Sequence, residues 1–219
     1  MNSSSPLSRR KFLKNLTAMG LLPCCGLLGN LQQALAANTL QIPQGIISLR
    51  GKVTVNGLTA SKGTLVKAGY TVHTAKNSEV IYVIENNAFL QHEESVVEFG
   101  VDALTHFMRV FSGRILSVFG NANKSLHVPT AVIGLRGTAC HLGVEPDKTY
   151  LCLCYGEVEV TLTDPSTLPF FLKASHHDHP VYLHAQRNLK VEPADMLDHQ
   201  DDELKLLEAL VGRIPPFIK

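Results

Sequence analysis

No aspartate or glutamate occurs in the first 78 residues of this chain, and the first acidic side chain is Glu79. The sequence also lacks a Cys-x-x-Cys-His haem motif, a glycine-rich phosphate loop and a recognisable nucleophile triad. These absences exclude c-type haem and give no ground for expecting an enzyme. Beyond residue 36, no apolar run reaches the roughly 20 residues that a membrane-spanning helix needs.

The first 36 residues have the basic, apolar and small-residue order of an export signal. A polar start leads into the run SRRKFLK at residues 8–14, and a weakly apolar stretch with several glycines follows over residues 16–31. The stretch ends in Ala34-Leu35-Ala36, a small-x-small cleavage site. The residues that define the basic motif are Arg9, Arg10, Phe12 and Leu13.

This motif closely resembles a twin-arginine (Tat) signal. The resemblance implies the Tat translocase as a partner, export of a folded protein and a periplasmic location. An uncleaved membrane anchor is the alternative, although the apolar run is short and contains Pro23. In that case the signal would be the only contact with the membrane.

Cleavage would leave residues 37–219, enough for one domain with a sizeable core. The whole chain has a net charge of +1, and loss of four basic residues with the signal lowers it to −3. Because a nucleic-acid binder needs a basic surface, we expect no nucleic-acid partner.

Short alternating runs dominate residues 45–163. Val53 and Val55 alternate with polar residues, and so do Val158 and Val160. Turn signals separate the runs at Asn56-Gly57, Asn86-Asn87, Ser112-Gly113 and Pro146-Asp147. This spacing predicts an all-β fold, an antiparallel sandwich or a barrel-like domain.

From about Gly51 to about Leu162 the sequence resembles the FecR-like domain family. The resemblance rests on LVKAGYTVHTAKNSEV (65–80), on VPTAVIGLRGTACHLGVE (128–145) and on Gly156. The family motif residues in the second segment are Gly134, Arg136, Gly137 and Thr138. The resemblance implies an extracytoplasmic β domain that senses a ligand or binds an envelope protein.

The best-known members pass a signal to a sigma factor through a cytoplasmic segment that precedes a membrane helix. Here only seven residues precede the twin-arginine motif, so the anti-sigma role is not expected to carry over. Arg136, between two glycines, is interpreted as a structural residue that bonds nearby carbonyls, with a ligand-binding role as the alternative.

After Asp164 the pattern changes. Residues 164–199 are predicted to be a loop or extension that carries histidines, and residues 200–219 an amphipathic helix with its tail. Asp198 is the candidate N-cap, and Gly212 with Pro215-Pro216 ends the helix. Leu204, Leu207, Leu210 and Val211 form its apolar face.

Four histidines fall within residues 176–184. If this segment is extended, His177 and His179 face the same way, as two metal ligands would, and Pro180 favours extended geometry at His179. An ordinary polar surface loop and a pH sensor are the alternatives.

Three cysteines remain after cleavage: Cys140, Cys152 and Cys154. If Pro146-Asp147 closes a hairpin, paired residue numbers sum to 293, which places His141 opposite Cys152 and Ala139 opposite Cys154. This register keeps Leu142, Leu151 and Leu153 on one face with Cys140. A one-residue slip would instead allow a Cys140–Cys152 disulfide.

In the favoured register Cys152, Cys154 and His141 share the face away from the leucines, and His177 can supply a fourth ligand. Two thiolates and two imidazoles suit a zinc, copper or iron ion. Plain packing of small cysteine side chains is the alternative. The sequence therefore suggests a non-catalytic exported domain for sensing or interaction, or a metal-binding or redox protein of the cell envelope.

Overall fold

The computed structural model describes residues 42–102, 106–185 and 190–218. Over these residues the chain forms fifteen strands and a C-terminal helix, α3 (Asp201–Leu210). One sheet runs in the order β1 (Gly45–Arg50), β5 (Glu79–Ile84), β6 (Asn87–Gln91), β8 (His106–Val118), β11 (Ala139–Val144), β12 (Lys148–Leu162), β14 (Val181–His184) and β15 (Val191–Pro193). The other runs β3 (Leu58–Thr59), β2 (Val53–Val55), β4 (Thr71–Thr74), β7 (Val96–Asp102), β8, β9 (Lys124–Val128), β10 (Ala131–Leu135), β12 and β13 (Phe170–Ala174).

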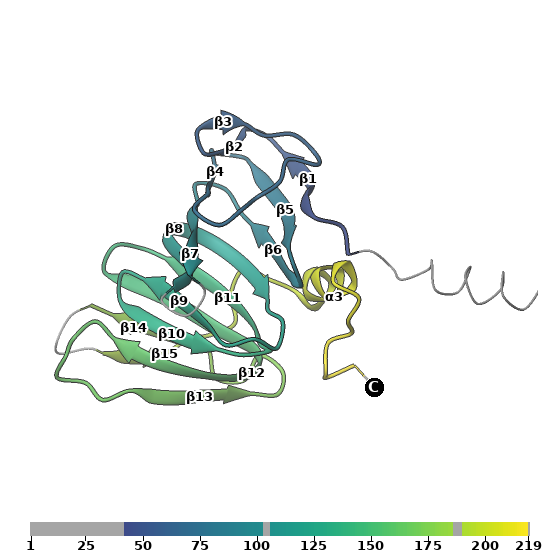
Figure 1. The fold of residues 1–219 in the computed structure, drawn as a ribbon. Helices are drawn as coiled ribbons and strands as arrows, with labels where there is room; N and C mark the ends of the chain where they lie inside the picture. The colour runs from purple at the N-terminus through teal and green to yellow at the C-terminus, as the bar shows by residue number, and fades with distance from the viewer. Residues whose placement is uncertain (1–41, 103–105, 186–189, 219) are drawn as a thin grey trace, which may run out of the picture. The chain divides into compact units, whose positions relative to one another are not determined.

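The predicted all-β fold with one C-terminal helix is confirmed (Figure 1). The strands follow from the alternation of apolar and polar residues, because residues two apart along a strand face the same side. Val132 and Gly134 of β10 are half-buried while Ala131, Ile133 and Leu135 are buried. The pairing is antiparallel except between β8 and β9, which run parallel.

Strands β8 and β12 belong to both sheets, and each changes partners at a glycine. Gly113 lies in β8 with φ +87°, and Gly156 lies in β12 with φ +100°. A Cβ at Gly156 would stand 2.6 Å from the Thr138 Cγ2, and one at Gly113 would stand 2.1 Å from the Ser95 Oγ. Only glycine fits such positions, since other residues avoid positive φ and these sites leave no room.

The turn predictions were partly right. Asn56 and Gly57 have the positive φ angles of a tight hairpin turn, 50° and 77°. Ser112-Gly113 is not a turn, because β8 continues through it and only changes sheets. The turn expected at Asn86-Asn87 lies one residue earlier, and Asn87 already belongs to β6.

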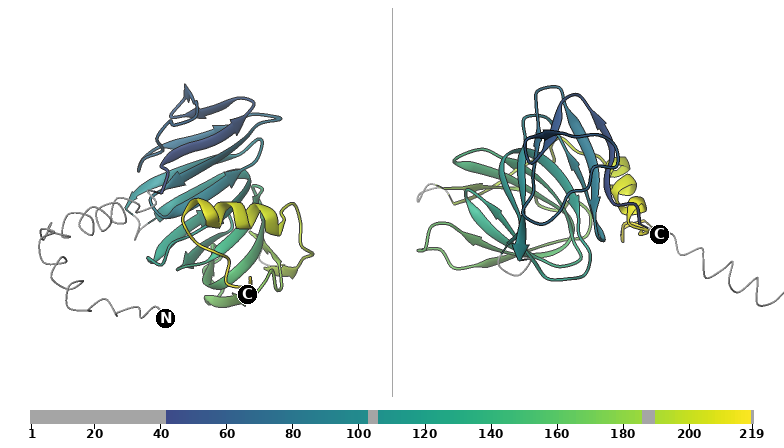
Figure 2. Two further views of the ribbon diagram at one scale, coloured as in Figure 1. Left: turned by 90° about the vertical axis from the view of Figure 1, so that its right-hand side faces the viewer. Right: turned by 45° about the horizontal axis from the view of Figure 1, so that its top comes forward.

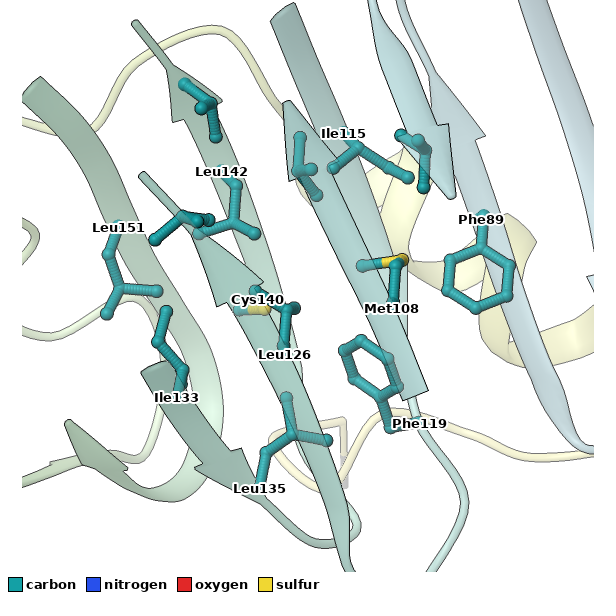
Figure 3. Packing of buried hydrophobic residues seen from close by; sticks show 14 of the residues in the cluster. Phe89, Met108, Ile115, Phe119, Leu126, Ile133, Leu135, Cys140, Leu142 and Leu151 are labelled. Atoms are coloured by element: carbon teal, nitrogen blue, oxygen red, sulfur yellow. The ribbon is translucent and has the colours of Figure 1, made fainter. Parts of the chain in front are cut away.

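Five strands close into a barrel by the pairings β8–β11–β12–β10–β9–β8. The inner faces of both sheets supply the main core, which contains Met108, Leu126 and Ile133 from one sheet and Ile115 and Leu142 from the other (Figure 3). Closure pairs the strand edges within the barrel and buries a continuous apolar interior.

Helix α3 covers the outer face of the first sheet, against β6 and β8 (Figure 2). The predicted stripe is buried, with Leu204 and Leu207 fully inaccessible and Val211 only 5% exposed. They pack with Val83, Ala88, Leu90, Leu116 and Val118 in a second apolar cluster. Gly212, with φ +70°, follows the helix as expected.

The N-cap prediction was wrong by two residues. Gln200 caps α3, and its backbone N–H donates to the Glu203 carboxylate at 3.0 Å, as in a capping box. Asp198 instead forms an ion pair with Arg114, whose Nη1 lies 3.0 Å from the Asp198 Oδ2. An ion pair with a residue of β8, distant in sequence, therefore decided the role of this carboxylate.

Residues 164–199 are not one loop, because they contain β13, β14 and β15. β13 and β14 both pair with β12, and β15 pairs with β14. Strands this short have little periodicity of their own, so their hydrogen bonds to a partner distant in sequence define them.

The export motif and the cleavage site lie outside the described residues, and both stay predictions. Within the part of the chain that the structure describes, no helix is long and apolar enough to cross a membrane.

Candidate metal centre

The β11–β12 hairpin has the predicted register. His141 lies opposite Cys152, and Cys140 lies opposite Leu153. Cys140 is buried in the core among leucines (Figure 3) and, like Cys152 and Cys154, is a free thiol. The alternative of a Cys140–Cys152 disulfide in a slipped register is therefore wrong.

A bulge corrects one detail of this register. Ala139 lies opposite Tyr155, and Cys154 is the additional residue on β12. Cys154 joins Tyr155 in the apolar cluster under α3, whereas Leu153 faces the main core. Cys152 and Cys154 are both completely buried.

The segment that brings His177 to these thiols is a turn and not an extended strand. His177 and His179 have φ angles of 52° and 54°. The Asp178 carboxylate accepts the backbone N–H groups of Ser175 (2.7 Å) and His176 (3.3 Å), which closes the turn. The expectation that His177 and His179 face the same way in an extended segment was therefore wrong.

Strand β12 itself holds His177 in place. The backbone N–H of His177 donates to the Cys154 carbonyl at 2.9 Å. The His177 Nδ1 then lies 3.6 Å from the Cys152 Sγ. His177 therefore lies beside Cys152, and its role as a metal ligand stays a prediction.

A second histidine, His199, reaches the thiols from the segment before α3. The Tyr150 hydroxyl fixes this segment, because it donates to the Asp195 carbonyl (3.1 Å) and accepts the Leu197 N–H (3.0 Å). The His199 Nε2 lies 3.0 Å from the His177 Nδ1. His199 was not predicted as a ligand, since a single histidine between Asp198 and Gln200 forms no recognisable ligand spacing.

One donor atom from each of Cys152, Cys154, His177 and His199 lies within 4.8 Å of the other three. All four side chains are almost inaccessible, including that of His177, which is 6% exposed. Two thiols and two imidazoles brought together out of reach of solvent are the donor set of a tetrahedral metal site.

His141, the remaining predicted ligand, does not belong to this group. Its ring lies flat against His199, with centroids 4.6 Å apart and an interplanar angle of 6°. The segment before α3 brings His199 over this face, so His199 supplies the donor that His141 was expected to give. His141 instead packs on a candidate ligand, and its buried Nδ1 has no hydrogen-bond partner among the residues that the structure describes.

The tautomer of His199 suits metal binding. Its Nδ1 lies 2.6 Å from the Leu197 carbonyl, which can only accept, so Nδ1 carries the proton. In the neutral ring Nε2 then carries no proton, and its lone pair is free to bind a metal at the cluster. A backbone carbonyl in this role is common around ligating histidines.

The two thiols differ in acidity. A hydrogen bond from the Cys154 thiol lowers the pKa of Cys152 to about 3, and the hydrogen bond from His177 acts in the same direction. Burial raises the pKa of Cys154. Burial disfavours a charge on His177, but the Cys152 and Asp201 contacts outweigh it and raise the pKa of His177. Both shifts favour a Cys152 thiolate beside a protonated His177 when no metal is bound.

No protein-family model matches this sequence, and no curated protein matches it. Two crystal structures of a "putative anti-sigma factor" from Parabacteroides distasonis, at 2.50 and 1.65 Å resolution, are similar in part. Their TM-scores are 0.48 and 0.47, with 10% and 9% identity over 62% and 63% of this chain. The match spans 63% and 64% of those chains, and it concerns the course of the β strands alone.

The residues that carry the resemblance to the FecR-like family, 134–138, lie where β10 leads into β11. Gly137 has φ +59°, the Arg136 Nε donates to the Asn121 carbonyl at 2.8 Å, and Thr138 abuts Gly156. Gly134 lies within β10. The carbonyl contact of Arg136 agrees with the structural role interpreted from the sequence.

Cys152, His177 and Asp201 also lie in the order of a nucleophile, a base and an orienting carboxylate. The His177 Nε2 is 3.1 Å from the Asp201 Oδ1. A nucleophile must however meet its substrate, and the Cys152 residue has no accessible surface. Burial therefore favours metal binding over nucleophilic chemistry at this cluster.

Proposed function

We propose that this protein is an exported, non-catalytic β domain that binds one transition-metal ion through Cys152, Cys154, His177 and His199. The observation that carries the proposal is the convergence of these four donor atoms, which lie within 4.8 Å of one another on side chains that are almost inaccessible. They come from β12, from the turn after β13 and from the segment before α3, so the folded chain alone assembles them.

Charge balance supports a divalent ion. Two buried thiolates would be costly without compensation. A divalent ion neutralises them, and the His177 and His199 rings then bind as neutral ligands. Binding would release the Cys154 thiol proton and the His177 proton, as expected for a site whose ligands must be deprotonated.

The donor set favours zinc, with copper or iron as the other candidates. Thiolate and imidazole ligands suit all three, whereas magnesium and calcium need oxygen ligands. Four protein donors leave no open position for water in a tetrahedral site, which is the arrangement of a structural site and not of a hydrolytic one.

The test is metal analysis of the full chain purified from its own cells. We expect one ion per protein at this site, and Co²⁺ substitution should give the intense thiolate-to-metal absorption of a tetrahedral sulfur site. Cys152→Ser should abolish both signals. Cys140→Ala, which removes a thiol on the opposite face of the same hairpin, is the matched control and should retain them.

Two results would contradict the proposal. One is a native protein without metal that also fails to bind Co²⁺. The other is rapid alkylation of Cys152 by iodoacetamide in the native protein, which would show an accessible thiol and favour the nucleophile interpretation instead.

Export through the twin-arginine pathway to the periplasm is part of this proposal. Its support is the SRRKFLK run with Arg9 and Arg10. A folded export route is compatible with metal loading in the cytoplasm, where thiols stay reduced. Changing both arginines to lysine should leave the protein in the cytoplasm, and an unchanged periplasmic yield would refute the assignment.

Sensing of a small ligand is the second candidate function, and a pocket favours it. About 270 Å³ in volume, it is lined in part by Arg114, His141, Gly143 and Tyr150. An occupant would touch His141, which stacks on the candidate ligand His199. Mass spectrometry of the native protein should detect a bound compound that a pocket-filling Gly143→Leu variant lacks. Absence of such a compound from the wild type would count against sensing.

A further inference from the structure

We infer that the chain holds a second metal ion next to the first, bound by His176, Asp201 and the outer nitrogen of His177. The inference rests on the proposed function, since His177 would serve both ions. Its starting point is a second group of three donors, whose ligand atoms also lie within 4.8 Å of one another.

The two ring nitrogens of His177 face different partners. Nδ1 lies 3.6 Å from the Cys152 Sγ and 3.0 Å from the His199 Nε2. Nε2 lies 3.1 Å from the Asp201 Oδ1. Either nitrogen of an imidazole can bind a metal, so one ring can bridge an inner and an outer ion.

Asp201 connects the two histidines of the outer group. Its Oδ1 lies 2.9 Å from the His176 Nε2 as well as 3.1 Å from the His177 Nε2. Without metal, protons occupy the space between these atoms, and a cation would replace the protons.

The outer donors are held in position. The His176 ring stacks on Phe217, with centroids 4.0 Å apart and an interplanar angle of 26°. Asp201 is the first residue of α3, whose apolar stripe is buried against the first sheet. Neither side chain therefore needs a large rearrangement to bind an ion.

The field around the outer group tolerates a cation. The N-terminal end of a helix is positive, which disfavours one. Asp201, Asp202 and Glu203 lie in the first turn of α3 and offset that end. A bridging His177 loses both ring protons and becomes an anion, which adds a further negative charge between the two ions.

The two positions differ in access to solvent. The inner donors are buried, whereas the side chain of His176 is 46% exposed and that of Asp201 is 37% exposed. Three protein ligands of two nitrogens and one oxygen leave an open coordination position that water can fill. The outer ion would be a borderline divalent cation such as Zn²⁺, bound more weakly than the inner one.

The experiment is a Zn²⁺ titration of the metal-free full chain against a chromophoric chelator, with Co²⁺ absorption as the second readout. Wild type should bind two Zn²⁺ per chain. His176→Ala and Asp201→Asn should each bind one and keep the Co²⁺–thiolate absorption of the inner site. His179→Asn, in the same turn but outside both donor groups, should still bind two.

The outcomes separate this inference from the proposed function. A wild type that binds a single ion, with thiolate absorption, overturns the second ion and leaves the first. Two ions in both the wild type and His176→Ala also overturn it, because the second ion would then lie elsewhere. A protein that binds none, without thiolate absorption, refutes both.

Discussion

At the scale of single residues, the candidate site depends on side chains that never touch the proposed ion. The Tyr150 hydroxyl is one, because it makes two hydrogen bonds that fix the segment containing His199. Such supporting contacts commonly change metal affinity by 10–100-fold when they are removed. The ligand set alone therefore does not determine how tightly an ion is held.

Tyr150→Phe should weaken Zn²⁺ binding at the inner site by roughly ten-fold, because the segment before α3 loses its anchor while all four donors remain. A chelator competition measures the change. Tyr182→Phe is the control, since Tyr182 packs against the Tyr150 ring with centroids 5.6 Å apart. Equal affinities for wild type and Tyr150→Phe would show that the segment is held by other contacts.

His92 links stability to pH. Burial lowers its pKa, aided by Arg114 and opposed by Glu203, Glu79 and Asp198. A histidine whose folded pKa is depressed binds more protons when unfolded, so its contribution is present above pH about 6.5 and is lost as the pH falls.

His92→Gln should therefore make the free energy of unfolding fall less steeply between pH 7 and pH 5. Denaturant titrations of the metal-free protein at several pH values measure the slope. His73→Gln, at an exposed position of β4, controls for the loss of a histidine as such. The idea fails if the His92 variant and the wild type show the same slope.

At the scale of elements, α3 has two tasks. Its apolar stripe covers the outer face of the first sheet, and its first residue, Asp201, bonds the candidate ligand His177. The segment that enters the helix carries His199. Docking of the helix and assembly of the site are therefore coupled, because the same short piece of chain does both.

Leu207→Asp should lower the free energy of unfolding by about 4 kcal/mol, since it places a charge where an apolar side chain is fully buried. Leu206→Asp is the matched control, because Leu206 is 47% exposed on the same helix. Its effect should stay within about 0.5 kcal/mol. Chemical denaturation measures both, and similar losses in the two variants would disprove docking by this stripe.

At the scale of the whole described domain, metal binding should stabilise the fold, because its donors come from three separate segments. An ion that binds only the folded chain raises stability with its concentration, by about 4 kcal/mol at roughly 1000 times its Kd. For a domain of this size that corresponds to a rise in Tm of about 10 °C.

Removal of metal by a chelator should thus lower the Tm by about 10 °C, and added Zn²⁺ should restore it. Calorimetry of the wild type and of Cys152→Ser measures this. The variant lacks an inner ligand and should show a much smaller response to chelator and zinc. A wild type whose Tm ignores both would mean that the thiols and imidazoles hold no ion.

The sequence by itself determined the β body, the C-terminal helix with its stop at Gly212, and the hairpin register that separates Cys140 from Cys152. These features depend on alternation, turn residues and helix stop signals, which act between near neighbours in the chain. Only the tertiary structure decided that β8 and β12 change sheets at Gly113 and Gly156, and that His199 joins the cysteines while His141 packs behind it. A metal site joins donors that are far apart in sequence, and the approach of the segment before α3 to β12 depends on packing that no local pattern records.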